Sequence, residues 1–138
     1  VEGYDGKNGY AMNYVVNKLQ IQKDYVAESF DTDFIDFESK GFSAQVLGKE
    51  KVGDKDCFKV ELTKNVNKTV YYFDVQNYFL LKEVKKDETL IFSDFKKVNG
   101  LVMPFRIEAN TPKKEGDYVM ILNRIDTNKA FPENTFKF

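Results

Sequence analysis

The densest group of potential metal ligands in the sequence is an acidic run formed by Asp31, Asp33, Asp36 and Glu38. Carboxylates at this density could hold Ca²⁺, but an EF-hand loop needs oxygen ligands at alternate positions, a glycine at the sixth and a glutamate at the twelfth. Counted from Asp31, the fifth position is Ile35 and the twelfth is Phe42, so the pattern does not match. We interpret these carboxylates as capping and solvated surface groups and expect no metal site.

The chain contains one cysteine and no histidine, which removes most familiar catalytic arrangements. Ordinary zinc sites draw on Cys and His ligands, and Ser-His-Asp or Cys-His nucleophile systems need a histidine base. Cys57 opens an alternating apolar segment, and free cysteines are usually buried, so we interpret it as a core residue. The many carboxylates could supply a pair for glycoside hydrolysis, but no pair stands out. We expect a protein that is not an enzyme and binds no cofactor.

The residues best suited to binding are apolar side chains in the middle of the chain. Val70–Phe73 and Leu90–Phe92 are apolar at successive positions, so both faces of those strands would be apolar. Such strands are covered on both sides, here either by helices or by a bound apolar ligand. The candidate lining residues of a hydrophobic ligand site are Tyr71, Phe73, Phe79, Leu81, Ile91, Phe92 and Met103. Each could equally be ordinary core packed under helices.

These candidates fall within a series of short strand-like segments from Lys49 to Ile125, separated by turn-forming stretches such as VGDKD, KNVNK, KKDE and KKVNG. Regular spacing of this kind is typical of an all-β sandwich, barrel or meander. The segments are VLGKEKV, CFKVELT, TVYYFDV, FLLKEVK, TLIFSDF, LVMPFRIEA and YVMILNRID. Pro104 lacks an amide donor, so we expect it at a sheet edge or a bulge.

The first third of the chain has a different pattern, which predicts a hairpin followed by helices. Asp-Gly and Asn-Gly pairs in VEGYDGKNGYAMN predict a hairpin turn between two short strands. A helix is predicted from Asn13, which could cap its first turn, because the spacing of Val15, Leu19, Val26 and Phe30 places them near one helical face. A second short helix is predicted over Asp33–Lys40, with Gly41 at its stop position. These helices would cover one face of the sheet.

Composition and charge narrow the class of protein. A chain of 138 residues with 42% hydrophobic residues is expected to form one globular domain. The net charge is -1, with Lys matched by Asp and Glu along the chain, so we expect no nucleic-acid partner. No apolar stretch reaches the roughly 18 residues needed to span a bilayer. Because the chain starts at Val1 without a signal peptide, we interpret it as a processed product or an excised fragment.

The order of motifs along the chain resembles that of the outer-membrane lipoprotein-sorting proteins of Bacteroidetes-type bacteria. The motifs are GYDGKNGYAMN, FIDFESKGFSAQVLGKEKVGDKDCFKVELT, KTVYYFD, FSDFKKVNGLVMPFRIE and NRIDTNKAFPENTF. Glycine, turn and aromatic positions recur together over nearly the whole chain. These proteins belong to the LolA/LolB-like superfamily, which also includes the sensor domain of the anti-sigma-factor regulator RseB.

The resemblance implies a mainly β (α+β) fold. The expected architecture is a curved antiparallel sheet or incomplete β-barrel of about 7–9 strands, with one or two helices covering its concave face. Residues 1–138 would form a single LolA/LolB-like domain that lacks the family's N-terminal helix and strands. No position matches the basic residue that latches the lid of the carriers, so no individual functional residue is carried over.

The resemblance also implies a function. The expected protein is a non-enzymatic, periplasmic or outer-membrane-associated carrier that binds a lipid acyl chain or a lipoprotein on a hydrophobic concave face. The alternative is a protein-interaction or envelope-stress sensory module of RseB-like type that uses the sheet edge or the concave face. A sheet that lacks its first strands would have an exposed edge, and such edges recruit other strands. We therefore expect pairing through that edge, either with a second copy in a homodimer or with the missing portion.

Overall fold

The computed structural model describes residues 2–23, 25, 32–111 and 116–132, and the chain divides into two compact units. The smaller unit combines Val1–Thr32 with Asn128–Phe138, and the larger unit is Asp33–Thr127. Strands and turns make up the regular structure of both, and none of the described residues is helical.

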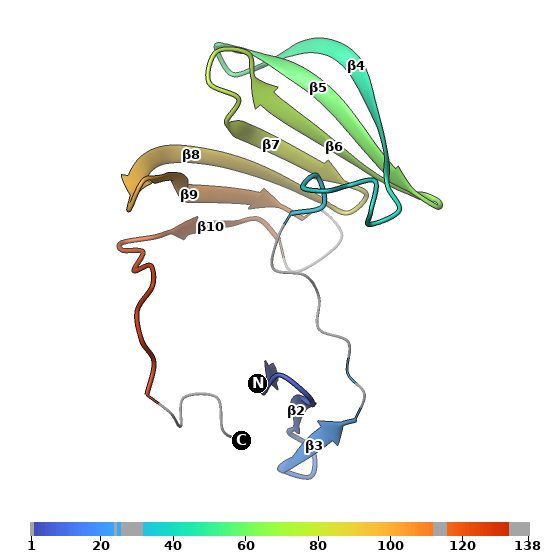
Figure 1. The fold of residues 1–138 in the computed structure, drawn as a ribbon, viewed down its shortest axis with the longest axis vertical. Helices are drawn as coiled ribbons and strands as arrows, with labels where there is room; N and C mark the ends of the chain where they lie inside the picture. Colours follow the sequence, from blue (N-terminus) through green and yellow to red (C-terminus); the bar gives the residue numbers. More distant parts are fainter. Residues whose placement is uncertain (1, 24, 26–31, 112–115, 133–138) are drawn as a thin grey trace. The chain divides into compact units, whose positions relative to one another are not determined.

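The smaller unit contains a three-stranded antiparallel sheet in the order β1-β2-β3 (Figure 1). Its strands are β1 (Glu2–Tyr4), β2 (Gly9–Asn13) and β3 (Lys18–Gln22). The predicted hairpin between β1 and β2 is confirmed. Asp5 Oδ1 accepts hydrogen bonds from the N–H groups of Asn8 and Lys7 at 2.7 and 2.8 Å, and Oδ2 accepts one from the Tyr10 hydroxyl. These donors, led by Asn8, lower the pKa of Asp5 to about 2.

The first predicted helix is wrong wherever the structure describes it. Asn13 does cap a turn, since its Oδ1 accepts the N–H groups of Val15 and Val16 at 3.0 and 3.3 Å, but the turn joins β2 to β3. Asn17 closes that connection with a φ of 49°. An asparagine side chain that accepts hydrogen bonds from nearby backbone N–H groups can stabilise a hairpin turn as well as the start of a helix. The sequence pattern therefore did not distinguish the two. Val26 and Phe30 lie outside the described residues.

The second predicted helix, over Asp33–Lys40, is also wrong, because residues 33–41 form consecutive turns. Asp36 has a φ of 51°, in the left-handed region, which interrupts a right-handed helix after three residues. Gly41, predicted to end this segment, does have the left-handed conformation of such an end, with a φ of 80°. The Phe42 N–H reaches back to the Phe37 carbonyl at 2.9 Å, as after a helix end. Helices over the sheet are therefore absent from the described residues.

The larger unit contains a seven-stranded antiparallel sheet in the order β10-β9-β8-β7-β6-β5-β4 (Figure 1). Its strands are β4 (Ser43–Val52), β5 (Lys55–Lys64), β6 (Asn67–Asp74), β7 (Leu80–Lys85), β8 (Glu88–Val98), β9 (Leu101–Asn110) and β10 (Tyr118–Ile121). The sheet curves so that β4, β5 and β6 arch over the later strands, and its end strands do not pair with each other. The predicted mainly β, curved and open antiparallel sheet is confirmed.

Turn chemistry explains why these strands follow one another as hairpins. Asn99 and Gly100, between β8 and β9, have φ values of 48° and 88°, the combination that a two-residue hairpin turn of type I′ needs. Gly53 between β4 and β5 and Asn65 between β5 and β6 are also left-handed. Pro104 lies in β9 opposite Phe95 of β8, beyond the point where β10 ends. Locally it is therefore at an edge, although β9 lies inside the sheet.

Strand pairing divides the middle of the sheet into two faces. Phe58 pairs with Phe73 and Val60 with Tyr71, and paired residues point to the same side, which we call the Tyr71 face. Cys57 pairs with Asp74 and Lys59 with Tyr72 on the opposite side, which we call the Tyr72 face. On that face, Cys57, Tyr72 and Leu81 form a buried cluster. The partly buried apolar residues packed against it are Val52, Val70, Phe79, Val84 and Phe95.

Candidate functional site

An open cleft with a volume of about 550 Å³ lies beside the buried cluster of the Tyr72 face. Half of the residues that line it are apolar: Val52, Phe79, Leu81, Ile91, Phe92 and Phe95. The others are Gly53, Lys55, Asp74, Asn77, Ser93 and Asp94. The lining residues come from the β4–β5 hairpin, the end of β6, the β6–β7 connection, β7 and β8. The cleft therefore combines an apolar surface with a small set of polar groups, as small-molecule sites do.

Two aromatic rings from neighbouring elements make the apolar side of the cleft. The rings of Phe79 and Phe95 are tilted by 32°, with centroids 5.0 Å apart. Beneath them, Leu81 and Cys57 are 7% and 0% exposed. A register shift between Tyr72 and Phe73 makes Leu81 the extra residue of a β-bulge, which allows it to join Tyr72 instead of facing away. The bulge thus places Leu81 in the cleft.

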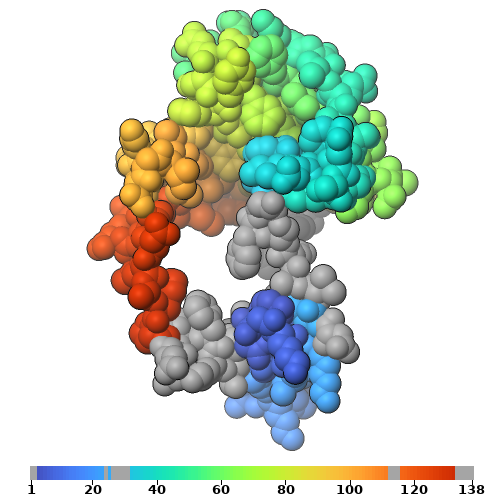
Figure 2. Space-filling view, viewed as in Figure 1, coloured from blue at the N-terminus to red at the C-terminus, as the bar shows by residue number. Residues whose placement is uncertain are grey.

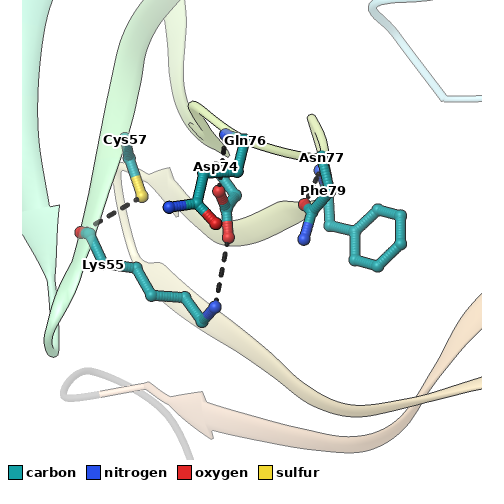
Figure 3. Close-up of polar contacts among 6 residues, drawn as sticks. All are labelled: Lys55, Cys57, Asp74, Gln76, Asn77 and Phe79. Carbon is teal, nitrogen blue, oxygen red and sulfur yellow. Dashed lines mark hydrogen bonds and ion pairs between the residues drawn. The ribbon is translucent and has the colours of Figure 1, made fainter.

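The polar corner of the cleft is built around Asp74, the last residue of β6 (Figure 3). Its side chain is only 3% exposed, and its Oδ2 lies 3.3 Å from the Lys55 ammonium. Its Oδ1 accepts the N–H of Gln76 at 2.8 Å. The hydrogen bond from Gln76, with the nearby Lys55 ammonium, lowers the pKa of Asp74, so the carboxylate stays ionised although it is buried.

The connection that follows Asp74 is fixed by its own hydrogen bonds. The Tyr78 N–H donates to the Asp74 carbonyl at 2.9 Å, and the Phe79 N–H donates to Asn77 Oδ1 at 2.9 Å. Tyr78 adopts a φ of 61°, in the left-handed region. This ordered connection sets the direction in which Phe79 enters the cleft (Figure 3).

Cys57 lies under this corner and does not take part in chemistry that the cleft could perform. It is fully buried, and its thiol donates a long hydrogen bond to the Lys55 carbonyl at 3.7 Å (Figure 3). Burial, and then the negative charge of Asp74, raise the pKa of Cys57 above its usual value. A buried neutral thiol is a poor nucleophile, which agrees with the structural role inferred from the sequence.

The part of the Tyr71 face around Tyr71 and Phe73 is covered by the chain itself. Phe34, from the turn segment before β4, packs edge-on against Tyr71 and Phe73 with ring centroids 5.4 Å away in each case. Figure 2 shows that the segment containing Phe34, drawn in cyan, lies against the sheet. Tyr71 is consequently 2% exposed, and burial raises its pKa. Phe34 occupies the place that the predicted helices were expected to fill.

The structure separates the seven candidate lining residues into groups. Phe79, Leu81, Ile91 and Phe92 line the cleft together. Tyr71 and Phe73 lie instead on the Tyr71 face under Phe34. Met103 is on β9 opposite Lys96 and does not line the cleft.

Sequence reasoning missed several residues of the cleft, notably Val52, Lys55, Asp74 and Phe95. For Asp74 a signal was available, because it follows Val70 and Tyr72 at alternate positions and so shares their inward face. For Lys55 there was no comparable signal. It flanks a turn, where a lysine is ordinarily solvated.

No group of three or more Cys, Asp or Glu side chains that could hold a metal ion occurs among the described residues. In the same part of the chain, no helix has the length and apolar character to cross a bilayer.

The sequence matches no protein-family model and no curated protein, but three solved structures share its fold. The first, from Vibrio parahaemolyticus, is described as an outer membrane lipoprotein-sorting protein domain. It is 15% identical, with a TM-score of 0.64 over 94% of this chain and 63% of that one. The second is a DUF1329 family protein from Desulfovibrio piger. It is 16% identical, with a TM-score of 0.61 over 99% of this chain and 68% of that one.

The third is a LolA superfamily protein from Nitrosomonas europaea, 14% identical, with a TM-score of 0.54 over 98% of this chain and 68% of that one. The chain therefore shares, over nearly its whole length, the fold of part of each of these three proteins. The resemblance inferred from motif order is thereby confirmed at the level of fold. The chain spans less than two thirds of the length of the Vibrio protein domain, so the activity of a whole LolA-like protein does not transfer to it directly.

Proposed function

We propose that this protein is a non-enzymatic, carrier-like binder of a lipid acyl chain or lipoprotein, located in the periplasm or at the outer membrane of a Gram-negative envelope. The observation that carries the proposal is the open apolar cleft on the Tyr72 face. Support also comes from the fold, since two of the similar structures are described as a lipoprotein-sorting domain and a LolA superfamily protein. The residues 1–138 are proposed to act as one LolA/LolB-like domain.

The size and composition of the cleft suit a single acyl chain rather than a bulky ligand. Its volume of about 550 Å³ falls inside the range of roughly 300–1,000 Å³ that is usual for ligand pockets. The paired rings of Phe79 and Phe95 offer apolar surface to a methylene chain. Removing such surface from water is the dominant favourable contribution to binding.

Titration of a fluorescent twelve-carbon acyl probe, kept below its micelle concentration, tests this proposal. Ile91→Glu places a charge on a residue that lines the cleft and is 39% exposed, so the fold should tolerate it. The cost of burying that carboxylate against the acyl chain should weaken binding by at least about tenfold. Val102→Glu is the matched control, because Val102 is 44% exposed and does not line the cleft. It should change affinity less than about twofold.

Two outcomes contradict the proposal. Failure of the wild-type protein to bind the probe, although circular dichroism shows it folded, removes the carrier function. If Ile91→Glu and Val102→Glu weaken binding of the probe equally, the probe does not bind in the cleft.

The alternative function, a protein-interaction or sensory module, is favoured by one edge of the large sheet. Among the described strands, β10 pairs only with β9, and its residues Tyr118, Val119, Met120 and Ile121 are all exposed. The opposite edge, β4, carries a bulge between Val46 and Gly48 followed by the charged run Lys49–Lys51, and both devices discourage strand addition. The β10 edge has neither and suits pairing with a second copy of this chain.

Light scattering after size-exclusion chromatography distinguishes this alternative. Wild-type protein should self-associate as its concentration rises, and Met120→Lys should abolish the association by placing a charge on the edge. Val46→Lys makes the same kind of change on the already protected β4 edge and should have no effect. A wild-type protein that stays monomeric at every concentration contradicts edge pairing.

A further inference from the structure

The polar groups around the cleft on the Tyr72 face carry a bias in charge. Among the described residues that line it, Lys55 is the only cation, whereas Asp74 and Asp94 are both carboxylates. The Lys55 ammonium is already engaged by Asp74 at 3.3 Å. A ligand that reaches this corner therefore meets one ion pair within the lining and, at Asp94, a carboxylate whose lysine partner lies outside the lining.

Asp74 cannot move away to free Lys55 for a ligand. Its side chain is almost completely buried, and its second carboxylate oxygen is held by the Gln76 N–H at 2.8 Å. An anionic head group beside Lys55, whose side chain is half exposed, would thus lie close to a fixed, buried carboxylate. Like charges at short range repel more strongly where one of them is buried than in bulk water.

Asp94 adds to this effect from β8. Its φ of 52° is left-handed, a conformation that Asp and Asn adopt more readily than most residues. Its carboxylate pairs at 2.8 Å with Lys96, which does not line the cleft. Both members of this ion pair are about half exposed, so solvent moderates their effect on a ligand, and Asp94 is the member that lines the cleft.

Uncharged donors are available at the same corner. Asn77 uses its Oδ1 to accept the Phe79 N–H, which leaves its Nδ2 group as a donor that makes no hydrogen bond within the described residues. Ser93 lines the cleft from β8 with a hydroxyl group. Both groups can donate to an ester or hydroxyl oxygen without the repulsion that a carboxylate would meet.

We propose that the cleft selects amphiphiles with one apolar chain and an uncharged, oxygen-bearing head group, such as a glyceryl ester, and rejects the free carboxylate of a fatty acid. The selectivity rests on the proposed function, because it presumes that the apolar part of the cleft holds an acyl chain. It adds a class of head group that the fold does not specify.

The test compares monododecanoylglycerol with dodecanoic acid, which share one acyl chain, by isothermal titration calorimetry at pH 8 below their micelle concentrations. The glyceryl ester should bind at least about tenfold more tightly than the fatty acid. If neither compound binds, the proposed function fails and the selectivity fails with it. If both bind equally, or the acid binds more tightly, the head-group inference is overturned while the carrier function stands.

A variant at the cleft identifies the source of the selectivity. Asp94→Asn removes the charge without backbone strain and should improve binding of the fatty acid by about threefold, with binding of the ester unchanged. Asp56→Asn removes one negative charge from an exposed site on β5 outside the cleft, so it should leave the ratio of the two affinities as it is in the wild type. An equal effect of both variants would show that net charge of the whole protein sets the preference, which also overturns the inference.

Discussion

The two faces of the large sheet start from similar apolar residues and end in different states. On the Tyr71 face, Phe34 from the preceding turn segment seals Tyr71 and Phe73. On the Tyr72 face, the bulge at Leu81 and the rings of Phe79 and Phe95 leave an open cleft. Phe34 covers Tyr71, whereas on the Tyr72 face the buried cluster around Cys57 leaves the cleft beside it open.

The difference also has an electrostatic component. The described contacts that seal the Tyr71 face at Phe34 are ring against ring. The Tyr72 face instead combines apolar surface with an ion pair between the half-exposed Lys55 and the buried Asp74.

The largest expected effect comes from truncating the sealed face. Tyr71→Ala removes a ring that is 2% exposed and packs against Phe34 and Phe73, so it should lower the free energy of unfolding by about 3–5 kcal/mol. Ile91→Ala, on the open face, should cost no more than about 1.5 kcal/mol because Ile91 is already partly solvated. Urea denaturation followed by circular dichroism measures both changes. Equal losses in the free energy of unfolding would contradict the difference in packing between the two faces.

A smaller effect is expected when the cover itself is removed. Phe34→Ala should lower the free energy of unfolding by about 1.5–3 kcal/mol and expose Tyr71 and Phe73. The variant should bind an apolar dye such as anilinonaphthalene sulfonate more strongly than the wild type, because a second apolar surface becomes accessible. Phe131→Ala serves as a control, since Phe131 is 63% exposed and lies outside the larger unit. Unchanged dye binding in Phe34→Ala would mean that Phe34 does not seal this face.

The smallest effect concerns acid stability at the corner of the open face. The folded-state pKa of Asp74 is lowered, chiefly by the Gln76 hydrogen bond, so its stabilising contribution is complete above the unfolded pKa of about 3.9. That contribution is lost as the pH falls through the lower, folded-state value. Asp74→Asn should therefore lower the thermal midpoint at pH 7 by several degrees, and the difference from wild type should shrink steadily in acid.

The matched control for the acid series is Asp56→Asn, because the Asp56 side chain is 62% exposed and its ion pair with Lys51 is long, at 3.5 Å. Its thermal midpoint should follow that of the wild type across the pH range. A gap between wild type and Asp74→Asn that stays constant down to pH 2 would contradict the assigned role of the Asp74 carboxylate.

Much of the large sheet could be predicted from the sequence because strand alternation and turn residues agree with each other. The Asn99-Gly100 turn and the alternation of Phe58, Val60 and Leu62 fix hairpins locally, without help from distant contacts. The helices failed for an equally local reason. Asn13 caps a hairpin turn as readily as a helix, and the left-handed φ of Asp36 is not visible in an apparently helical pattern.

The cleft was only half predictable from the sequence. Apolar residues such as Phe79 and Ile91 stand out, but the bulge that turns Leu81 toward Tyr72 depends on the pairing of β6 with β7. The sealing of Tyr71 by Phe34 depends on a contact between residues that are far apart in the sequence. Alternation within one strand cannot reveal either feature, because both arise when separate segments meet.

The most direct test of the open cleft is an NMR titration of isotopically labelled wild-type protein with monododecanoylglycerol, read from backbone amide shifts. We predict that the largest shifts occur at Leu81, Ile91 and Phe95, which line the cleft. Val60, Tyr71 and Phe73, on the sealed face, should stay close to their free positions. Large amide shifts on the Tyr71 face, with unchanged shifts for the residues that line the cleft, would contradict ligand binding in the cleft.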